Sequence, residues 1–381
     1  MLFLFPIIIL STILLAWTFL MSSIIVTIFP PFWDPLIWIS LIGTLSFIFG
    51  IIGANVWPQP AASRLYFWGA ISLWSITVAG FIAGFFLIIS DLTQYSFQTT
   101  TWLITYIILA ISANIWALYS SWVPRITSYK VKIHKEHNWH WKKIVMISDT
   151  HYGNIYGITS ARSLVKRINT LDAEIVLIPW DFFDGPLIDY ASIVKEFGNI
   201  NAPHGVLFTN GNHEEYTHNA KILKSIKNPV LGIRKPKATE KLHHSLATCK
   251  QEIIVINNEK IEINGMVFAG VTYHDTETSA WLKKNLNELL FDDHKPNILL
   301  KHKPTLHSVL RKYPIDLVVS GHTHQAQMWP FTLVTYMIYG KYTYGIVKKN
   351  GMTSITSNGV WSWWPPHRIG TRSEIVVIEI V

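Results

Sequence analysis

The sequence predicts two parts of different architecture: an all-α bundle of about four transmembrane helices over residues 1–124, and an α/β domain over residues 142–381. The first prediction rests on charge, because residues 1–124 contain only three charged side chains. The second rests on short apolar runs that alternate with amphipathic stretches, a pattern typical of α/β folds. The residues between the two parts, 125–141, are polar and basic, and we expect them to be a linker.

Four apolar stretches make up the first part, and none of them contains a charged side chain. Each is long enough to cross a bilayer core of about 30 Å, which needs ~20 helical residues. They run over Leu2–Phe29, Leu36–Val56, Leu65–Ile89 and Thr101–Ser121. Buried core helices of a soluble protein are the alternative, but four consecutive uncharged runs argue against it. Because no basic segment precedes the first run, we expect a retained helix rather than a signal peptide.

The charged side chains around these stretches predict the orientation. With four crossings, Arg64 and the basic segment after the fourth stretch lie on one side of the membrane, whereas Asp34 and Asp91 lie on the other. Since loops rich in Lys and Arg stay inside, the α/β domain is predicted to be cytoplasmic.

Overall charge and cysteine content narrow the function classes. The formal net charge is +8, and because residues 1–124 contribute −1, the remainder carries +9. A basic domain at a membrane is attracted to anionic headgroups, so the lipid bilayer is an expected partner. No helix-turn-helix, zinc-finger or RNA-binding signature occurs, and we expect no nucleic-acid partner. The single cysteine, Cys249, excludes an internal disulfide.

The α/β domain begins with a buried strand and continues with alternating elements. The predicted strands are Lys143–Ile147, Glu174–Ile178, Val206–Thr209, Ile253–Ile256, Lys260–Ile263, Met266–Val271, Asn297–Leu300, Leu317–Ser320 and Glu374–Ile380. The predicted helices are Ile158–Leu171, Ala191–Phe197 and Thr278–Leu290. The pair Asn264-Gly265 is a strong hairpin signal, so the strands from 253 to 271 are expected to be antiparallel.

Five short motifs follow the ends of predicted strands. They are Asp149-Thr150-His151, Asp181-Phe182-Phe183-Asp184-Gly185, Gly211-Asn212-His213-Glu214, Lys301-His302-Lys303 and Gly321-His322-Thr323-His324. The carboxyl ends of strands gather the ligand-binding groups of α/β folds, so we expect these side chains to converge. Their O and N donors suit divalent metals. Taken singly, Asp149 could be a turn residue and His302 a surface histidine, but jointly the motifs favour a metal site.

The order of these motifs resembles the calcineurin-like metallophosphoesterase superfamily, over about Lys142 to Val381. The segments 321–327 and 365–374 resemble its bacterial, YkuE-like branch. The resemblance implies an αββα sandwich, here preceded by the transmembrane bundle. It also implies an integral, multi-pass protein of a bacterial inner membrane.

The resemblance further implies a role for each motif residue. One metal ion would be held by Asp149, His151 and His324, and the other by Asn212, His302 and His322, with Asp181 bridging both. The cofactors would be two divalent ions, Mn, Fe or Zn. His213 would protonate the leaving oxygen while a metal-activated hydroxide attacks phosphorus. Arg368 is a weaker candidate for a substrate contact. Trp180 departs from the family pattern, which has glycine before the bridging aspartate.

The expected reaction is hydrolysis of a phosphomonoester, phosphodiester or pyrophosphate. Residues 328–344 are apolar and aromatic, and they either pack in the core or form a lipid-facing edge beside the site. The second option favours a membrane lipid or a lipid-linked nucleotide as substrate. Two alternatives remain, a membrane-anchored nucleotide phosphodiesterase and a catalytically weak regulatory or binding membrane protein. The predicted helices lack the charged side chains of an ion pathway, which argues against a transporter.

Overall fold

The computed structural model describes residues 4–28, 33–56, 60–95, 100–153, 155–179, 181–184, 190–213, 253–273, 279–363 and 365–381. Four residues singled out in the sequence lie outside these ranges: Trp180, Gly185, Glu214 and Cys249. The chain divides into two compact units. The first contains the N-terminal helices and a short segment around Arg368, and the second contains the remainder from Trp122 onward.

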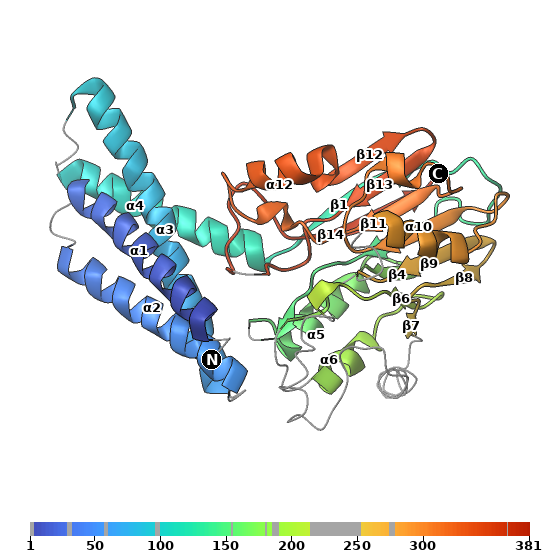
Figure 1. The fold of residues 1–381 in the computed structure, drawn as a ribbon, viewed down its shortest axis with the longest axis horizontal. Helices are drawn as coiled ribbons and strands as arrows, with labels where there is room; N and C mark the ends of the chain where they lie inside the picture. The colour runs from blue at the N-terminus through green and yellow to red at the C-terminus, as the bar shows by residue number, and fades with distance from the viewer. Residues whose placement is uncertain are drawn as a thin grey trace. The chain divides into compact units, whose positions relative to one another are not determined.

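Four helices form the first unit (Figure 1). They are α1 (Leu4–Ile28), α2 (Trp33–Val56), α3 (Pro60–Thr93) and α4 (Thr100–Trp122). Two of them, over Phe67–Thr93 and Thr101–Trp122, are long and apolar enough to cross a membrane. Within the described residues, α1 and α2 hold shorter apolar stretches, Leu15–Thr27 and Trp38–Gly50. The four predicted helices are therefore present, and two of them have the full dimensions of a membrane span.

Small and hydroxyl side chains join these helices. An added Cβ at Gly69 of α3 would lie 2.4 Å from the backbone nitrogen of Phe47 in α2, so only glycine permits this approach. The hydroxyls of Ser22 and Ser40 lie 2.7 Å apart between α1 and α2. The indole of Trp17 donates a 3.0 Å hydrogen bond to Thr77 of α3. Small residues and interhelical hydrogen bonds are the packing that helices use in lipid, where no hydrophobic force joins them.

Two six-stranded mixed sheets form the second unit. The order of the first sheet is β1 (Arg125–Val131), β14 (Glu374–Ile380), β2 (Lys143–Met146), β4 (Ile175–Ile178), β6 (Val206–Phe208) and β7 (Ile253–Val255). The order of the second is β12 (Gly345–Lys349), β13 (Met352–Thr356), β11 (Leu317–Ser320), β10 (Asn297–Lys301), β9 (Met266–Val271) and β8 (Glu259–Ile263). A small parallel pair joins β3 (Tyr152–Gly153) to β5 (Phe183–Asp184).

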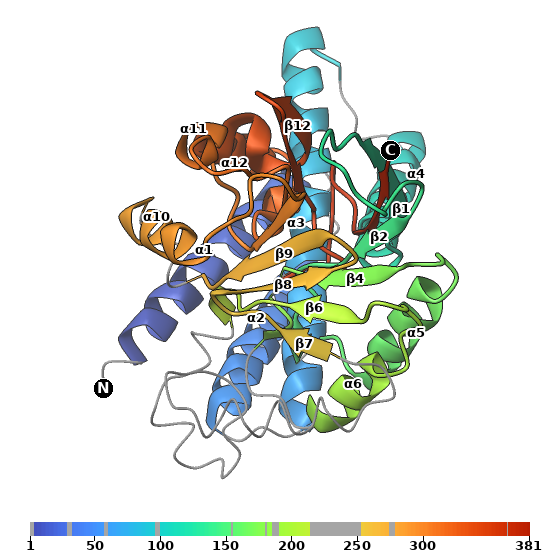
Figure 2. The same ribbon diagram turned by 90° about the vertical axis from the view of Figure 1, so that its right-hand side faces the viewer.

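The two sheets pack face to face, and helices cover their outer faces (Figure 2). Alternate residues of each strand point to opposite sides, so β2 sends Ile144 and Met146 into the core between the sheets. Its Val145 faces α5 (Ile158–Ile168) and α6 (Tyr190–Phe197) instead. On the far side, α10 (Ser279–Glu288) and α11 (His307–Leu310) pack on the second sheet. The α/β sandwich expected from the sequence is confirmed.

Four strands of the two large sheets differ from expectation: β1, β7, β12 and β13. Part of the expected linker is β1, which pairs in parallel with β14 over Arg125–Val131. The strand β7 does not join an antiparallel group, because it pairs in parallel with β6 in the first sheet. The β12–β13 hairpin was not predicted, although its turn holds Asn350 and Gly351 with φ of 54° and 78°. An Asn-Gly pair with both φ values positive is the preferred two-residue hairpin turn.

Candidate metal centre

The predicted ligands follow five strand ends of the two sheets. In the first sheet, β2, β4 and β6 are parallel and lead into Asp149, Asp181 and Asn212. In the second sheet, β10 and β11 are parallel and lead into His302 and His322. All of these side chains are buried except that of His322, which is partly exposed. The sandwich therefore places the motifs along one edge, as the strand-end argument predicted.

One group of donors consists of Asp149, His151 and His324, whose ligand atoms lie within 4.8 Å of one another. The Nε2 atoms of His151 and His324 are 3.0 Å apart. The Nε2 of His324 lies 3.4 Å from Oδ1 of Asp149. Among the described residues, none donates a hydrogen bond to the buried Oδ2 of Asp149. A buried carboxylate oxygen without a donor is costly, and a cation at this point would satisfy it.

A second group consists of Asp181, His302 and His322. The Nε2 of His302 lies 3.1 Å from Oδ2 of Asp181 and 3.2 Å from Nδ1 of His322. The same His322 nitrogen lies 3.1 Å from Oδ1 of Asn212, which brings the fourth predicted ligand into this group. Three imidazole and amide donors and one carboxylate thus face one point.

His213 lies beside both groups rather than inside either one. Its Nε2 is 3.9 Å from Oδ2 of Asp181, and its ring centroid is 4.8 Å from that of His151. The three side chains form a third group with converging ligand atoms. The backbone N–H of His213 donates a 3.0 Å hydrogen bond to Oδ1 of Asp181, which fixes the start of the loop. Its side chain is 15% exposed, so it is more open than the fully buried His302.

Hydrogen bonds outside the two groups orient the donors. The Nδ1 of His302 lies 2.9 Å from the carbonyl oxygen of Pro179. An N–H at that position leaves the Nε2 lone pair directed toward Asp181, which is the tautomer that a metal ligand needs. The backbone N–H of His322 donates to Oδ1 of Asp149 at 2.9 Å, and so ties a residue of the second group to the first.

The backbone at the centre is strained. Four of the seven predicted ligands have left-handed backbones: Asp149, His151, His322 and His324, with φ of 54°, 43°, 74° and 46°. Non-glycine residues in this region cost of order 1–3 kcal/mol each and cluster at functional sites. The fold maintains these conformations in four ligands together, which favours a role for the cluster beyond structure.

Two glycines leave room for the donors. A Cβ on Gly321 would lie 2.2 Å from Oδ2 of Asp149. Gly359, with φ of 86°, would place a Cβ 2.8 Å from Cβ of Asp149 and 3.2 Å from the His324 ring. Side chains at either position would displace the first group, so both glycines are required by close approach.

The charges of the cluster depend on one another. Burial raises the pKa of Asp181, but the adjacent His302 outweighs it and holds that pKa well below its usual range. The pKa of Asp149 is also lowered, because the effect of the adjacent His324 outweighs that of burial. Burial lowers the pKa of His302, yet Asp181 raises it to about 9. Burial, together with His302, lowers the pKa of His322 to about 3. Ionised carboxylates beside a neutral imidazole suit a divalent cation.

These observations fit a pair of divalent ions. The donors are oxygen and nitrogen atoms only, and they converge in adjacent groups. Among the described residues, the buried Oδ2 of Asp149 has no hydrogen-bond donor. Such a donor set suits Mn, Fe or Zn. The identity of each ion and the role of each ligand remain predictions.

Sequence reasoning missed two aromatic residues at the centre. Tyr273 follows β9, and its ring centroid lies 5.6 Å from that of His322 and 6.1 Å from that of His302. Tyr339 ends the helix α12 (Thr332–Tyr339) and lies 6.2 Å from His322. Tyr273 follows a predicted strand as the ligands do, and that position was the available signal. Arg368 is completely buried in the first unit, where its backbone N–H donates to Ala117 at 3.0 Å.

Comparison with known proteins identifies the domain. A family model described as calcineurin-like phosphoesterase matches residues 142–326, which include both groups of donors. Residues 142–326 are therefore similar to calcineurin-like phosphoesterases.

Relatives of the phosphoesterase domain occur in bacteria and animals. An uncharacterized metallophosphoesterase of Helicobacter pylori is 27% identical over 243 residues, which cover 63% of this chain and 60% of that protein. A transmembrane protein with metallophosphoesterase domain from Bos taurus is 29% identical over 264 residues, covering 66% and 56%. YkuE of Bacillus subtilis is 24% identical over 246 residues, covering 62% and 78%. The chain thus spans less than two thirds of the length of the first two.

Proposed function

We propose that this protein is a membrane-anchored phosphoesterase with two metal ions, hydrolysing a phosphomonoester, phosphodiester or pyrophosphate. The observation that carries the proposal is the convergence of seven O and N donors at adjacent strand ends, including a buried Asp149 oxygen without a donor among the described residues. Structural ion-pair networks also gather charge, but they do not hold histidine nitrogens 3.0 Å apart around two carboxylates.

In this mechanism, the donors divide between the two ions. Asp149, His151 and His324 would hold one ion, as their mutual distances support. His302, His322 and Asn212 would hold the second ion, and Asp181, whose carboxylate converges with His302 and His322 and also with His151, would be shared between the two. Two bound divalent ions lower the pKa of water and offset the charge on phosphoryl oxygens. The contribution of the chain is to keep the donors in place, through Pro179, Gly321 and the strained turns.

His213 supplies the proton. Its side chain is 15% exposed, and its Nε2 lies 3.9 Å from the Asp181 carboxylate. The protonated imidazole is the form that can protonate a departing alkoxide. A backbone hydrogen bond to Asp181 keeps His213 at the edge of the centre without making it a ligand.

The membrane anchor is the second part of the proposal. The apolar helices α3 and α4 have the length of membrane spans, and α4 leaves Ile108, Ile115 and Trp116 more than half exposed. Relatives that are named transmembrane proteins support the same conclusion. With the basic segment that follows α4, the positive-inside rule places the phosphoesterase domain in the cytoplasm.

An exposed apolar helix beside the metal centre favours a membrane-associated substrate. The segment 328–344 packs at its ends, where Met328, Tyr342 and Thr343 are buried. Its middle is α12, which has no buried residue. Large side chains on α12 and just before it are exposed, namely Trp329 62%, Tyr336 60%, Met337 75% and Ile338 66%. Exposed aromatic and aliphatic residues on one short helix are typical of an interfacial contact with lipid.

The first experiment tests the activity. The full chain, purified in detergent and loaded with Mn, should bind two ions and hydrolyse bis(4-nitrophenyl) phosphate. Two bound metals without turnover of this diester, or of 4-nitrophenyl phosphate, would instead support the regulatory interpretation.

A second experiment tests the lipid-facing helix. Polar replacement of Trp329, Phe331 and Tyr336 together should lower turnover of a phosphoester presented in anionic vesicles and spare a soluble ester. Trp281→Ser, at an indole that is 44% exposed elsewhere in the domain, is the matched control. Equal loss on both substrates would show that the segment supports the fold and not the interface.

The orientation has its own test. A reporter joined after Val381 should report the cytoplasm, because the basic segment between α4 and β2 stays inside. Cleavage of the domain by protease added outside intact cells would contradict the assignment.

A further inference from the structure

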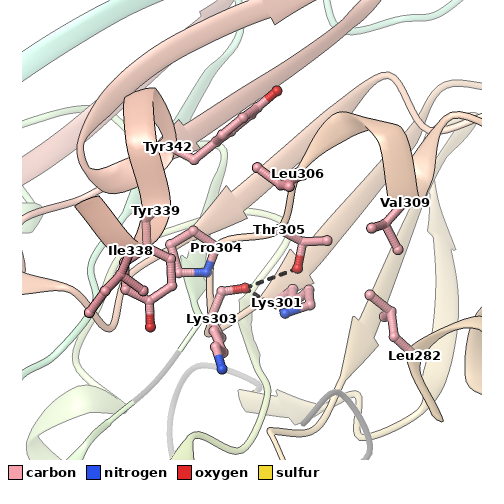
Figure 3. A pocket seen from close by; sticks show the side chains of 10 residues that line it. All are labelled: Leu282, Lys301, Lys303, Pro304, Thr305, Leu306, Val309, Ile338, Tyr339 and Tyr342. Atoms are coloured by element: carbon pink, nitrogen blue, oxygen red, sulfur yellow. Dashed lines mark hydrogen bonds between the residues drawn. The ribbon is translucent and has the colours of Figure 1, made fainter. Parts of the chain in front are cut away.

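A cavity of about 320 Å³ lies next to the metal centre (Figure 3). It is formed by the loop after β10, the end of α12, the turn η4 (Gly340–Thr343) and one residue of α10. All of these elements belong to the phosphoesterase domain. The volume lies at the lower end of the range of ligand pockets, which is about 300–1,000 Å³.

The cavity is connected to the metal centre through two elements. His302 stands between Lys301 and Lys303, and both lysines line the cavity. Tyr339 also lines it, and the same ring lies 6.2 Å from His322. A molecule bound in the cavity would therefore extend toward the point where the donors converge.

The cavity also borders the exposed helix. Ile338 lines it, and the same side chain is 66% exposed on α12. Leu306, on the opposite loop, lines it and is 52% exposed. Two aliphatic side chains of the cavity wall, from α12 and from the loop after β10, are thus also exposed on the surface of the domain.

Part of the cavity wall is apolar, and some of its inner polar atoms bond to one another. The carbonyl oxygen of Lys303 accepts hydrogen bonds from the buried ammonium of Lys301 and, at 3.5 Å, from the hydroxyl of Thr305 (Figure 3). The rest of the wall consists of Leu282, Pro304, Leu306, Val309 and Ile338, with the rings of Tyr339 and Tyr342. A polar occupant such as a nucleobase would find few groups to bond, whereas a hydrocarbon chain loses nothing by entering.

We propose that this cavity binds a single aliphatic chain of the substrate, so that the substrate is an amphipathic phosphoester. The inference rests on the proposed function and specifies its substrate class. The side chains of Lys303 and Tyr339 direct their polar atoms toward the same side in Figure 3, away from Leu306 and Val309. The Lys303 ammonium meets the negative charge of the phosphate at that side. The volume is at the lower end of the range of ligand pockets, which favours one chain over two.

The test uses diesters that share a leaving group. Alkyl 4-nitrophenyl phosphates with methyl, propyl and hexyl groups release the same nitrophenolate, so only the chain differs. For wild type, kcat/KM should rise along the series by up to about fourfold per methylene, equivalent to ~0.8 kcal/mol. The expected hexyl-to-methyl ratio is therefore large, and it saturates once the chain fills the cavity.

Two matched variants locate the effect. Leu306→Trp fills the cavity from an exposed position and should collapse the hexyl-to-methyl ratio. Leu333→Trp changes a leucine of α12 that is 57% exposed and is not part of the cavity wall, so it should keep the wild-type ratio. A wild-type ratio near one, or the same ratio in both variants, overturns the inference. So does a preference for thymidine 5′-(4-nitrophenyl phosphate) over the hexyl diester.

A binding measurement separates the cavity from catalysis. Titration of the Mn-loaded protein with hexyl phosphate and with methyl phosphate, followed calorimetrically, should show tighter binding of the hexyl compound. Leu306→Trp should remove that difference. If no diester is hydrolysed but the difference persists, the proposed function fails and the cavity assignment stands. If diesters are hydrolysed and hexyl phosphate binds no better than methyl phosphate, the cavity assignment fails alone.

Discussion

Gly321→Ala tests the metal centre without removing any of its ligands. The added Cβ would lie 2.2 Å from Oδ2 of Asp149, and 2.7 Å and 2.8 Å from Oγ and Cβ of Ser148. Contacts of real Cβ atoms essentially never fall below 3.0 Å, so the carboxylate must move by about 0.8 Å. Ser148 is completely buried, so the neighbouring chain offers little room for an adjustment.

The size of the effect follows from the tolerance of metal coordination. Metal–ligand distances in functional sites vary by only about 0.2 Å, so a shift of about 0.8 Å moves the Asp149 oxygen too far to coordinate the ion. We expect the affinity for one of the two ions to fall by roughly 10–100-fold, as it does when outer contacts of ligands are removed. Over-packing should also lower the stability by about 1–3 kcal/mol, which leaves most of the protein folded.

The assay is metal content after gel filtration, together with turnover of bis(4-nitrophenyl) phosphate at saturating and limiting Mn. The variant should keep one ion firmly, lose the other, and recover part of its activity at high Mn. Gly157→Ala is the control, because a Cβ there meets nothing within 4 Å among the described residues. Two firmly bound ions with wild-type turnover in Gly321→Ala would refute the placement of Asp149 in the centre.

Three further predictions address Asp181, His213 and His302. Asp181→Asn should lower metal content and remove most activity while the protein stays folded, and a fully metallated, active variant would exclude a bridging role. His213→Ala should retain both ions and lose activity mainly on esters with poor leaving groups, since nitrophenolate needs no proton; equal loss on all esters would indicate a structural role. In chelator-treated protein, burial lowers the pKa of His302 but Asp181 raises it to about 9, above its ordinary 6.5. The stabilisation is therefore complete below about pH 6.5 and lost as pH rises to 9, so Tm should fall over that window; an unchanged Tm would contradict the His302–Asp181 pairing.

The sequence predicts those features of the fold that depend on the local pattern of apolar and polar residues. Apolar runs followed by polar motifs located β2, β4 and β10 and their adjoining Asp149, Asp181 and His302. The partner of a strand is a long-range property, however, and β1 shows this. Exposed Ile126, Ser128 and Lys130 alternate with half-buried residues on this edge strand, and its polar composition resembles that of a linker. The segment is a strand because it pairs with β14, and its own composition does not predict that pairing.

The metal centre was predicted in its residue types and not in its geometry. Nothing in the sequence indicates that His151 and His324 would face each other at 3.0 Å, or that both would adopt positive φ. Those conformations depend on contacts such as Gly359 against Asp149, which join segments far apart in the chain. The sequence of residues 328–344 was compatible with either a core or a surface position. In the structure, the two ends of this segment are packed and its middle, α12, is exposed.

The position of β14 determines the order in which the domain can be completed during synthesis. It lies between β1 and β2, and these two strands leave the ribosome long before it does. Until Glu374–Ile380 is made, both strands have an unpaired edge, which is prone to incorrect pairing. By then every predicted metal ligand has already been translated. A premature stop between residues 325 and 373 therefore yields a chain with a complete set of ligands and an unfinished sheet, and its phenotype reports on folding, not on catalysis.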